Sequence, residues 1–269
     1  GKGDDTIDGG AGEDTIIWNL GDDLDTVTFS DVDHLKFGEG ITFEDLTFYA
    51  EGNNLRIVVK GDMTQGVICR DYFYSNNNKP ENIIFADGSV YSLQQSGLII
   101  HHGDRLESIS GTDYADTIYG GKGNNTISGG DGNDIIYGED GDDTISGGRG
   151  TDTIDGGTDA DTFIWNLGDD LDTITASNID KLQFGEGITK DSLTFRGEGN
   201  NLHIIINNDE TQGIILVYFF YNSDAKLNHV SFADGSSLNL ATIGLTLDQQ
   251  FSKGDTINGT DYDDIINAH

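Results

Sequence analysis

Apolar positions recur along this chain at a fixed spacing. Between Gly111 and Ile164 one large apolar residue stands at every ninth position, and most of its neighbours are polar or glycine. A segment such as Thr144-Ile145-Ser146 contains good strand formers with only the middle one apolar, and glycines in the six residues before it allow a tight turn. The apolar anchors are Ile118, Ile127, Ile136, Ile145, Ile154 and Phe163.

A turn followed by a three-residue strand, repeated without interruption, predicts a solenoid. Two nonapeptides complete one coil of 18 residues, so the inward-facing residues of alternate strands form two parallel sheets over a narrow core. Loops 18 residues apart then stack on the same edge. The acidic or amide residue two positions before each anchor forms two columns: Asp116, Asp134 and Asp152 on one edge, and Asn125, Asp143 and Asp161 on the other.

A second, longer period spans 147 residues. The segment Ile17–Thr26 returns unchanged as Ile164–Thr173, and Phe85–Ser89 returns as Phe232–Ser236. The chain is therefore divided into 1–16, the end of one roll block; 17–110, a β-rich cap or linker; 111–164, six nonapeptides; 165–258, a second cap or linker; and 259–269, the start of a further block. The expected fold is all-β, with parallel β-roll blocks alternating with β-rich cap segments.

The cap segments predict short strands separated by Asn-rich turns. In the first copy these are Leu46–Tyr49, Leu55–Val59, Val67–Tyr74 and Ile83–Phe85, with counterparts 147 residues on. A helical turn is expected at Thr42–Leu46 and a second short helix near Leu93–Leu98. The longest apolar run, Ile214–Tyr221, is too short to span a bilayer and predicts a buried strand.

Charge restricts the partners. Lys and Arg number 14 against 48 Asp and Glu, which gives a formal net charge of −34. Nucleic-acid backbones and anionic membrane surfaces are excluded as main partners because they would be repelled, whereas a cation fits. The single cysteine, Cys69, cannot form an internal disulfide.

Stacked aspartates identify the cation. Consecutive parallel strands lie about 4.8 Å apart, and at an effective dielectric constant of about 20 two carboxylates at that distance repel by roughly 3 kcal/mol. A divalent ion between the loops removes this repulsion and also binds the carbonyl groups of the glycine turns. Carboxylate and carbonyl oxygens without His or Cys select Ca²⁺, so we expect several bound Ca²⁺ ions.

These residues resemble the glycine- and aspartate-rich nonapeptide of RTX (repeats-in-toxin) proteins, which bind calcium in a parallel β-roll; Gly129–Tyr137 and Gly147–Asp155 match it well. The resemblance implies carboxylate ligands from the sixth loop position and carbonyl ligands from the first four. Carried over, with weaker binding expected where Asn125 replaces Asp, the ligands are Asp5, Asp14, Asp116, Asn125, Asp134, Asp143, Asp152, Asp161 and Asp264, together with Gly111, Asp113, Gly120, Lys122, Gly129, Asp131, Gly138, Asp140, Gly147 and Arg149.

The intervening segments resemble those that follow β-roll blocks in RTX proteins, where they cover the open end of a roll. Gly1 starts inside one repeat and His269 stops inside another, so the chain is interpreted as a tandem fragment of a large protein of a Gram-negative bacterium, secreted or at the cell surface. The resemblance implies export by a type I secretion machinery and calcium-driven folding that stabilises or extends a toxin or adhesin. The alternative is a polysaccharide- or cell-surface-binding module of an adhesin or an extracellular polymer-modifying enzyme.

Other candidate sites have ordinary explanations. The aromatic clusters 72–74 and 218–221 could stack on sugars, although core packing is favoured. The turns Gly21–Asp25 and Gly168–Asp172 could each hold another calcium ion or could be solvated turns. No His-Glu-x-x-His or Gly-x-Ser-x-Gly motif occurs, and we expect no catalytic activity within this segment.

Overall fold

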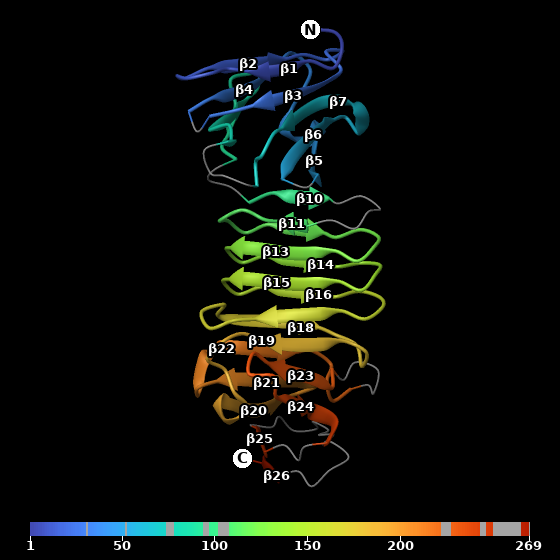
Figure 1. Ribbon diagram of the computed structural model, residues 1–269, viewed down its shortest axis with the longest axis vertical. Coiled ribbons are helices and arrows are strands. Elements are labelled where there is room, and N and C mark those ends of the chain that lie inside the picture. Colours follow the sequence, from blue (N-terminus) through green and yellow to red (C-terminus); the bar gives the residue numbers. More distant parts are fainter. Residues whose placement is uncertain are drawn as a thin grey trace.

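The computed structural model describes residues 1–30, 32–51, 53–73, 78–93, 97–101, 108–221 and 227–242, and the backbone of 246–249 and 265–268. The molecule is a long stack of coils with the two ends of the chain at opposite ends (Figure 1). The described part is all-β apart from three short 3-10 helices, η1 (Phe43–Asp45), η3 (Lys190–Ser192) and η5 (Leu240–Thr242). None of its helices is long and apolar enough to cross a membrane.

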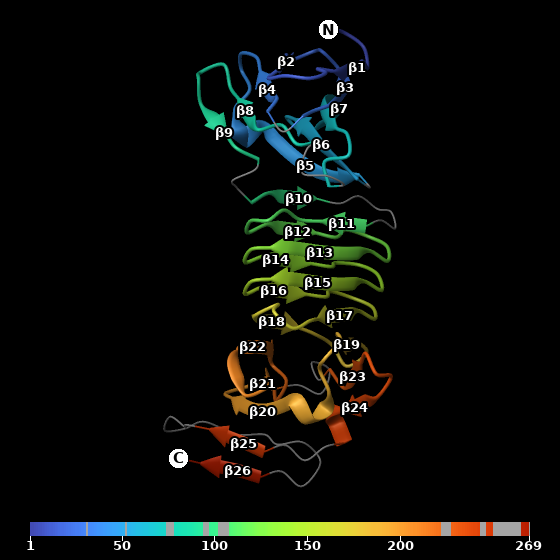
Figure 2. The ribbon, with the colours of Figure 1, turned by 60° about the vertical axis from the view of Figure 1, so that its left-hand side comes forward.

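The middle of the molecule is a parallel β-roll with two walls. One wall contains β10 (Ile99–His101), β12 (Thr117–Tyr119), β14 (Ile135–Tyr137), β16 (Thr153–Asp155) and β18 (Leu171–Thr175). The other contains β11 (Ser108–Ser110), β13 (Thr126–Asp131), β15 (Thr144–Arg149), β17 (Thr162–Trp165) and β19 (Lys181–Phe184). These strands lie across the long axis (Figure 2).

The register confirms the 18-residue coil. Ile118 pairs with Ile136, and Ile127 pairs with Ile145, each pair in parallel strands of one wall. The apolar anchors lie between the walls, and all six between Ile118 and Phe163 are at most 2% exposed. The chain thus forms the parallel roll that the nine-residue spacing predicts.

The roll extends beyond the six nonapeptides. Ile100 pairs with Ile118 and Ile109 with Ile127, which adds a coil before Gly111. At the other end Ile174 pairs with Ile154, and Leu182 with Phe163, at offsets of 20 and 19 residues. Residues 99–101 and 108–110 therefore continue the two walls and do not belong to the expected cap segment.

One wall of the roll continues through both intervening segments. Beyond β18 the sheet runs through β22 (Asp209–Leu216), β21 (Asn201–Ile206) and β20 (Leu193–Glu198); beyond β10 it runs through β5 (Leu46–Glu51), β6 (Asn54–Val59), β7 (Asp62–Cys69), β3 (Leu24–Thr28) and β1 (Thr6–Asp8). Within each segment the three neighbouring strands pair antiparallel, whereas β5 with β10 and β18 with β22 are parallel.

Among the described residues, the opposite wall is divided into two separate sheets. It continues from β19 to β23 (His229–Phe232) and β24 (Ser237–Asn239), and a separate sheet in the first copy holds β2 (Thr15–Trp18), β4 (His34–Phe37), β8 (Asn82–Ile84) and β9 (Val90–Tyr91). Near the end of the chain β25 (Thr246–Gln249) and β26 (Ile265–Ala268) pair in parallel, and β25 lies beside β20 as β10 lies beside β5 (Figure 2).

Two tryptophans occupy equivalent positions in the apolar core of the two copies. Trp18 and Trp165 are each 1% exposed and pack edge-on against Phe37 and Phe184 at 5.8 and 6.0 Å between ring centroids. Cys69 is also fully buried, and burial raises the pKa of its thiol.

Two strand predictions were wrong at their C-terminal ends. β22 ends at Leu216, and the predicted strand through Tyr221 is replaced by a turn; in the first copy β7 ends at Cys69 rather than Tyr74. Each turn contains a residue with positive φ, Tyr218 (58°) or its counterpart Asp71 (55°). The predicted turn at Thr42–Leu46 is the helix η1, whereas part of the predicted helix near Leu93–Leu98 lies outside the described residues.

Candidate metal centre

The sixth loop residue of each nonapeptide joins one coil to the next. The backbone N–H of Asp116 donates to Oδ1 of Asp134 at 2.8 Å, and that of Asp134 donates to Oδ1 of Asp152 at 2.8 Å. On the other edge the N–H of Asn125 donates to Oδ1 of Asp143 at 2.7 Å, and that of Asp143 to Oδ1 of Asp161 at 2.9 Å. The structure thus forms the two expected columns.

The second oxygen of four of these carboxylates has no hydrogen-bond partner. Oδ2 is buried and unpartnered in Asp134, Asp143, Asp152 and Asp161, and each of these residues is at most 1% exposed. A buried carboxylate oxygen without a partner is costly, because it loses its water and gains nothing in return. These four oxygens therefore mark positions where a cation would be stabilised.

Glycine at the first loop position leaves space beside each of these oxygens. A side chain at Gly129 would overlap both Oδ2 of Asp134 and the carbonyl oxygen of Gly147, one coil further on. A side chain at Gly138 would likewise overlap Oδ2 of Asp143 and the carbonyl oxygen of Gly156. At Gly129 and Gly138, a carboxylate oxygen and a carbonyl oxygen from adjacent coils therefore lie around one point.

Burial changes the protonation of these carboxyl groups. It is the main cause that raises the pKa of Asp134 and Asp161 to about 7 and that of Asp143 and Asp152 to about 6. Repulsion from neighbouring carboxylates adds to the increase, while the backbone N–H bond to Oδ1 opposes it. The ionised form of each group therefore lacks enough positive partners within the protein.

The donor set fits a hard cation. The column carboxylates are interleaved with main-chain carbonyls, and Ca²⁺ prefers six to eight such oxygens. Within the described part of the chain, no three acidic, histidine or cysteine side chains lie close enough to hold a metal ion between them. A cation here would therefore need carbonyl ligands as well as the columns.

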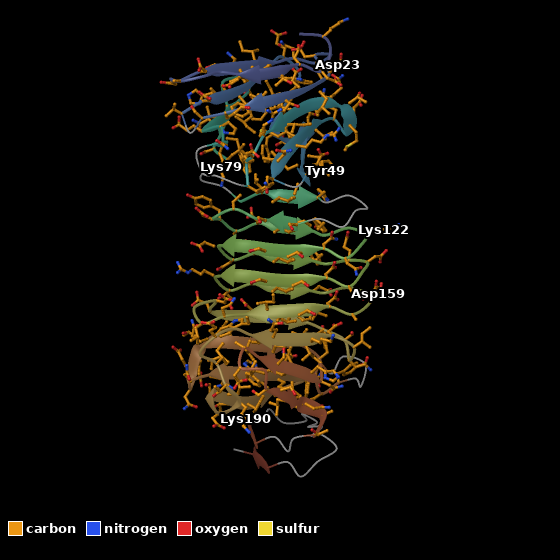
Figure 3. The ribbon with its side chains drawn as sticks, in the orientation of Figure 1. Asp23, Tyr49, Lys79, Lys122, Asp159 and Lys190 are labelled. Carbon is orange, nitrogen blue, oxygen red and sulfur yellow. The ribbon has the colours of Figure 1, made fainter. Side chains whose placement is uncertain are left out.

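The remaining predicted ligands have varied surroundings. Lys122 and Asp140 form a parallel bridge between adjacent loops, and Asp131 pairs with Arg149 in register. The carbonyls of Asp140 and Arg149 each accept an N–H from the loop before, from Gly123 and Gly132 at 2.8 Å, so each has one lone pair left. Lys122 and Asp159 project from one edge of the roll (Figure 3).

The carbonyl candidates of the first two loops differ. Gly111 and Gly120 occupy the same first position as Gly129, and a side chain at either would overlap a carbonyl oxygen of the next coil. Asp113 is exposed on the surface of the first loop. Their assignment as carbonyl donors stays a prediction.

The predicted ligands near the ends are less enclosed. In the first block the side chain of Asp5 is 55% exposed, whereas Oδ2 of Asp14 is buried and has no hydrogen-bond partner. Asp264 lies outside the described residues. All these ligand assignments stay predictions.

The two columns also extend to aspartates outside the nonapeptides. The N–H of Asp152 donates to Oδ1 of Asp172 at 2.9 Å, and that of Asp161 donates to Oδ1 of Asp180 at 3.0 Å. Burial raises the pKa of Asp172 to about 9. In the first copy Asp25 and Asp33 take the same roles toward Asp5 and Asp14. The signal was present, since each stands two positions before an apolar anchor, but the surrounding residues lack the glycine pattern.

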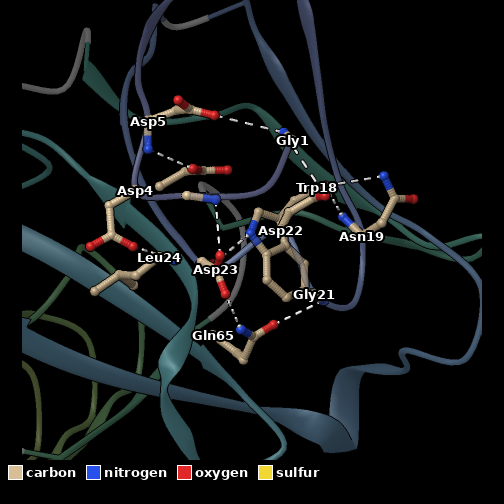
Figure 4. Close-up of polar contacts among 12 residues, drawn as sticks. Gly1, Asp4, Asp5, Trp18, Asn19, Gly21, Asp22, Asp23, Leu24 and Gln65 are labelled. Carbon is tan, nitrogen blue, oxygen red and sulfur yellow. Dashed lines mark hydrogen bonds and ion pairs between the residues drawn. The ribbon is translucent and has the colours of Figure 1, made fainter.

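The acidic turn Gly21–Asp25 uses much of its polar surface internally (Figure 4). The backbone N–H of Asn19 donates to Asp22 at 2.8 Å, and Gln65 donates to Asp23 at 3.0 Å. The indole N–H of Trp18 donates to the carbonyl of Asp23 at 3.1 Å. In the second copy Asn166 and Gln212 bind Asp169 and Asp170 in the same way. These bonds favour a hydrogen-bonded turn over an additional calcium site.

Two family models match the chain. One, described as the RTX calcium-binding nonapeptide repeat (4 copies), matches residues 1–25, 110–145, 137–172 and 251–269. The other, described as the haemolysin-type calcium binding protein related domain, matches residues 54–95 and 201–242. The matches fall on the coils and on the intervening segments, respectively.

Similar proteins were found by sequence and by structure. The iron-regulated protein FrpA of Neisseria meningitidis serogroup C is 29% identical over 116 residues, which cover 36% of this chain and 10% of that protein. The crystal structure of the extracellular lipase LipA from Serratia marcescens aligns with a TM-score of 0.30 and 16% identity, covering 80% of this chain and 37% of that one. The match thus spans about a tenth of the curated relative.

Proposed function

We propose that this chain, which carries RTX calcium-binding nonapeptide repeats, is a module that folds when calcium binds after export of its parent protein. The repeats bind Ca²⁺, several ions per module. In this proposal the parent is a large toxin or adhesin of a Gram-negative bacterium, exported unfolded by a type I machinery, and the roll stabilises or extends it outside the cell.

The buried, unpartnered oxygens of Asp134, Asp143, Asp152 and Asp161 carry this proposal. Most strands of the roll bury a single apolar residue, so its core is thin and cannot offset four such desolvated charges. Calcium would neutralise them and complete its coordination with loop carbonyls such as those of Gly147 and Gly156. Folding and ion binding are then one process.

Calcium availability gives the direction of the switch. Where Ca²⁺ is scarce, repulsion within a chain of net charge −34 favours an extended state. Where Ca²⁺ is abundant, binding to the folded state alone shifts the equilibrium toward the roll. Such a chain suits export before folding.

The repeats themselves are calcium-binding, non-catalytic modules. We extend this to the whole segment and place any catalytic domain of the parent elsewhere. A surface-binding role would be favoured by exposed aromatic residues repeated in both copies. Tyr218 and Tyr221 are exposed, but the counterpart of Tyr218 is Asp71, and Tyr74 lies outside the described residues. The calcium-folding role therefore has the stronger support.

The test is a far-ultraviolet circular dichroism titration of the chelated protein. We expect a cooperative change from a disordered to a β-rich spectrum at sub-millimolar to millimolar Ca²⁺, with no such change in Mg²⁺. A β-rich spectrum that responds to neither Ca²⁺ nor chelator would overturn the proposal. Polysaccharide arrays run on the calcium-loaded protein would then test the surface-binding alternative.

A further inference from the structure

The amide Asn125 occupies a column position that the other coils give to aspartate. The backbone N–H of Asn125 makes the same hydrogen bond as that of a column aspartate, since it donates to Oδ1 of Asp143. The side chain of Asn125 makes different bonds. The Nδ2 group donates to the carbonyl oxygen of Gly120 at 3.0 Å and to that of Gly123 at 2.9 Å. These are the first and fourth carbonyls of its own loop.

Those two carbonyls belong to the set that a cation would bind in this loop. The amide N–H groups of asparagine can take the place of the cation without carrying a charge, because their partly positive hydrogen atoms bind carbonyl oxygens that converge on one point. Asn125 is 2% exposed, so these bonds are formed away from water and the loop leaves no carboxylate charge to neutralise.

The neighbouring loop on the opposite edge is closed in another way. Oδ2 of Asp116 accepts the backbone N–H of Thr112 at 2.5 Å and the hydroxyl of Thr112 at 2.9 Å. Asp116 is therefore absent from the group of buried carboxylates with an unpartnered oxygen; in the six nonapeptides this group comprises Asp134, Asp143, Asp152 and Asp161. Thr112 stands where the following nonapeptide of that column has Gly130.

From these contacts we infer that Asn125 is a built-in substitute for calcium, so that the loop Gly120–Asn125 closes without an ion and, with Thr112 and Asp116, ends the calcium columns at this coil. This inference rests on the proposed function, because it takes the roll to bind calcium at the following coils. It changes the role of Asn125 from a weak ligand to a residue that decides which loops bind calcium.

The backbone of this loop approaches the next coil as the backbone of the other loops does. A side chain at Gly120 would overlap the carbonyl oxygen of Gly138, just as one at Gly129 would overlap that of Gly147. What the Gly120 loop lacks is the carboxylate. The substitution Asn125→Asp should therefore create a calcium site, and Asp143→Asn, one coil further along the same column, should remove one.

The experiment counts bound ions by native mass spectrometry of the full chain at saturating Ca²⁺, with far-ultraviolet circular dichroism to show that each variant is folded. We expect Asn125→Asp to bind one ion more than the unaltered chain and Asp143→Asn to bind one ion fewer. Asn125→Ala should keep the original count while its calcium-loaded form unfolds at lower urea concentration, since two buried carbonyls lose their donor.

Two results would overturn the inference alone. If Asn125→Asp keeps the original count and only binds more tightly, or if Asn125→Ala loses an ion, then Asn125 is a ligand. If the unaltered chain binds no calcium at all, the proposed function fails, and the inference fails with it. The count for the unaltered chain therefore separates the two failures.

Discussion

The backbone N–H of Asp134 and Oδ1 of Asp152, 18 residues later in the chain, are 2.8 Å apart. This bond holds one carboxylate oxygen of Asp152 against the coil before it and leaves Oδ2 beside its own glycine turn. Asp134, Asp143 and Asp161 have the same arrangement, so four carboxylates each keep Oδ2 available for a cation.

Replacing a column carboxylate should weaken calcium binding. Asp134→Ala removes an unpartnered oxygen and also the acceptor for the N–H of Asp116, so we expect the calcium concentration at half-folding to rise about tenfold, equivalent to about 1.4 kcal/mol. Circular dichroism titration measures this midpoint. Glu39→Ala, which removes an exposed carboxylate of the first intervening segment that is not a predicted ligand, is the control and should leave it unchanged. Equal shifts in both variants would show that general charge, rather than position, governs binding.

Filling the space beside the carboxylate should also be harmful. In Gly129→Ala the new methyl group meets Oδ2 of Asp134 and the carbonyl of Gly147, so we expect a loss of about 1–3 kcal/mol in the free energy of unfolding at saturating calcium. Urea denaturation measures it. Gly61→Asn is the control, because Gly61 has open space around it and a φ of 71°, which asparagine tolerates. If Gly129→Ala leaves the free energy of unfolding unchanged, the position beside Gly129 is not needed for calcium binding.

Acid should stabilise the roll when calcium is removed. The folded-state pKa of each column carboxyl lies above its ordinary value of 3.8, at about 6 for Asp143 and Asp152 and about 7 for Asp134 and Asp161. A raised pKa favours folding below the unfolded value, and this contribution is lost as pH rises through about 6 to 7.

Thermal melts of chelated, desalted protein at pH 4.5 and pH 8 measure this effect. We expect more β-structure and a higher midpoint at pH 4.5. With calcium present the sign reverses, because protons compete with the ion for the same oxygens. A chelated protein that is less folded at pH 4.5 would contradict the burial of these carboxyl groups.

An outer row of rings should stabilise the joint between segment and roll. Tyr49 on β5, His101 on β10, Tyr119 on β12 and Tyr137 on β14 follow one another, and the centroids of Tyr119 lie 4.8 Å from His101 and 5.1 Å from Tyr137. Tyr119→Ala breaks two stacked pairs and should cost about 1–3 kcal/mol in urea denaturation at saturating calcium. Tyr114→Ala, which has no ring partner among the described residues, should cost less than about 0.5 kcal/mol. If both variants lose the same free energy of unfolding, the stacked rings do not contribute to stability.

The regular part of the fold was predictable because each position is specified by the same short pattern. The spacing of Ile118, Ile127 and Ile136 sets the register, and the register brings Asp116 and Asp134 together. Ile100 and Ile109 keep the nine-residue spacing, but Leu98 and Glu107 stand two positions before them, where the nonapeptides have aspartate or asparagine, so the sequence pattern did not reveal this additional coil.

The turns after β7 and β22 depend on contacts that hydropathy does not show. The N–H of Tyr218 donates to the side chain of Asn201 on the neighbouring strand at 3.0 Å, and that of Asp71 donates to Asn54 at 2.9 Å. Each bond holds a positive-φ residue that ends the strand. The apolar run from Ile214 to Tyr221 predicts a strand because it contains no local turn former, whereas the asparagine is supplied from 17 residues earlier.

The strands of the roll lie across its long axis, so the hydrogen bonds that join them run along it. A pulling force between the two ends of the roll therefore acts on one coil at a time instead of shearing many bonds together. Each coil that opens releases 18 residues, about 60 Å of extended chain, and with only one cysteine no disulfide limits this extension. Under tension the module would unfold at low force, one coil at a time, and refold as calcium binds each loop again.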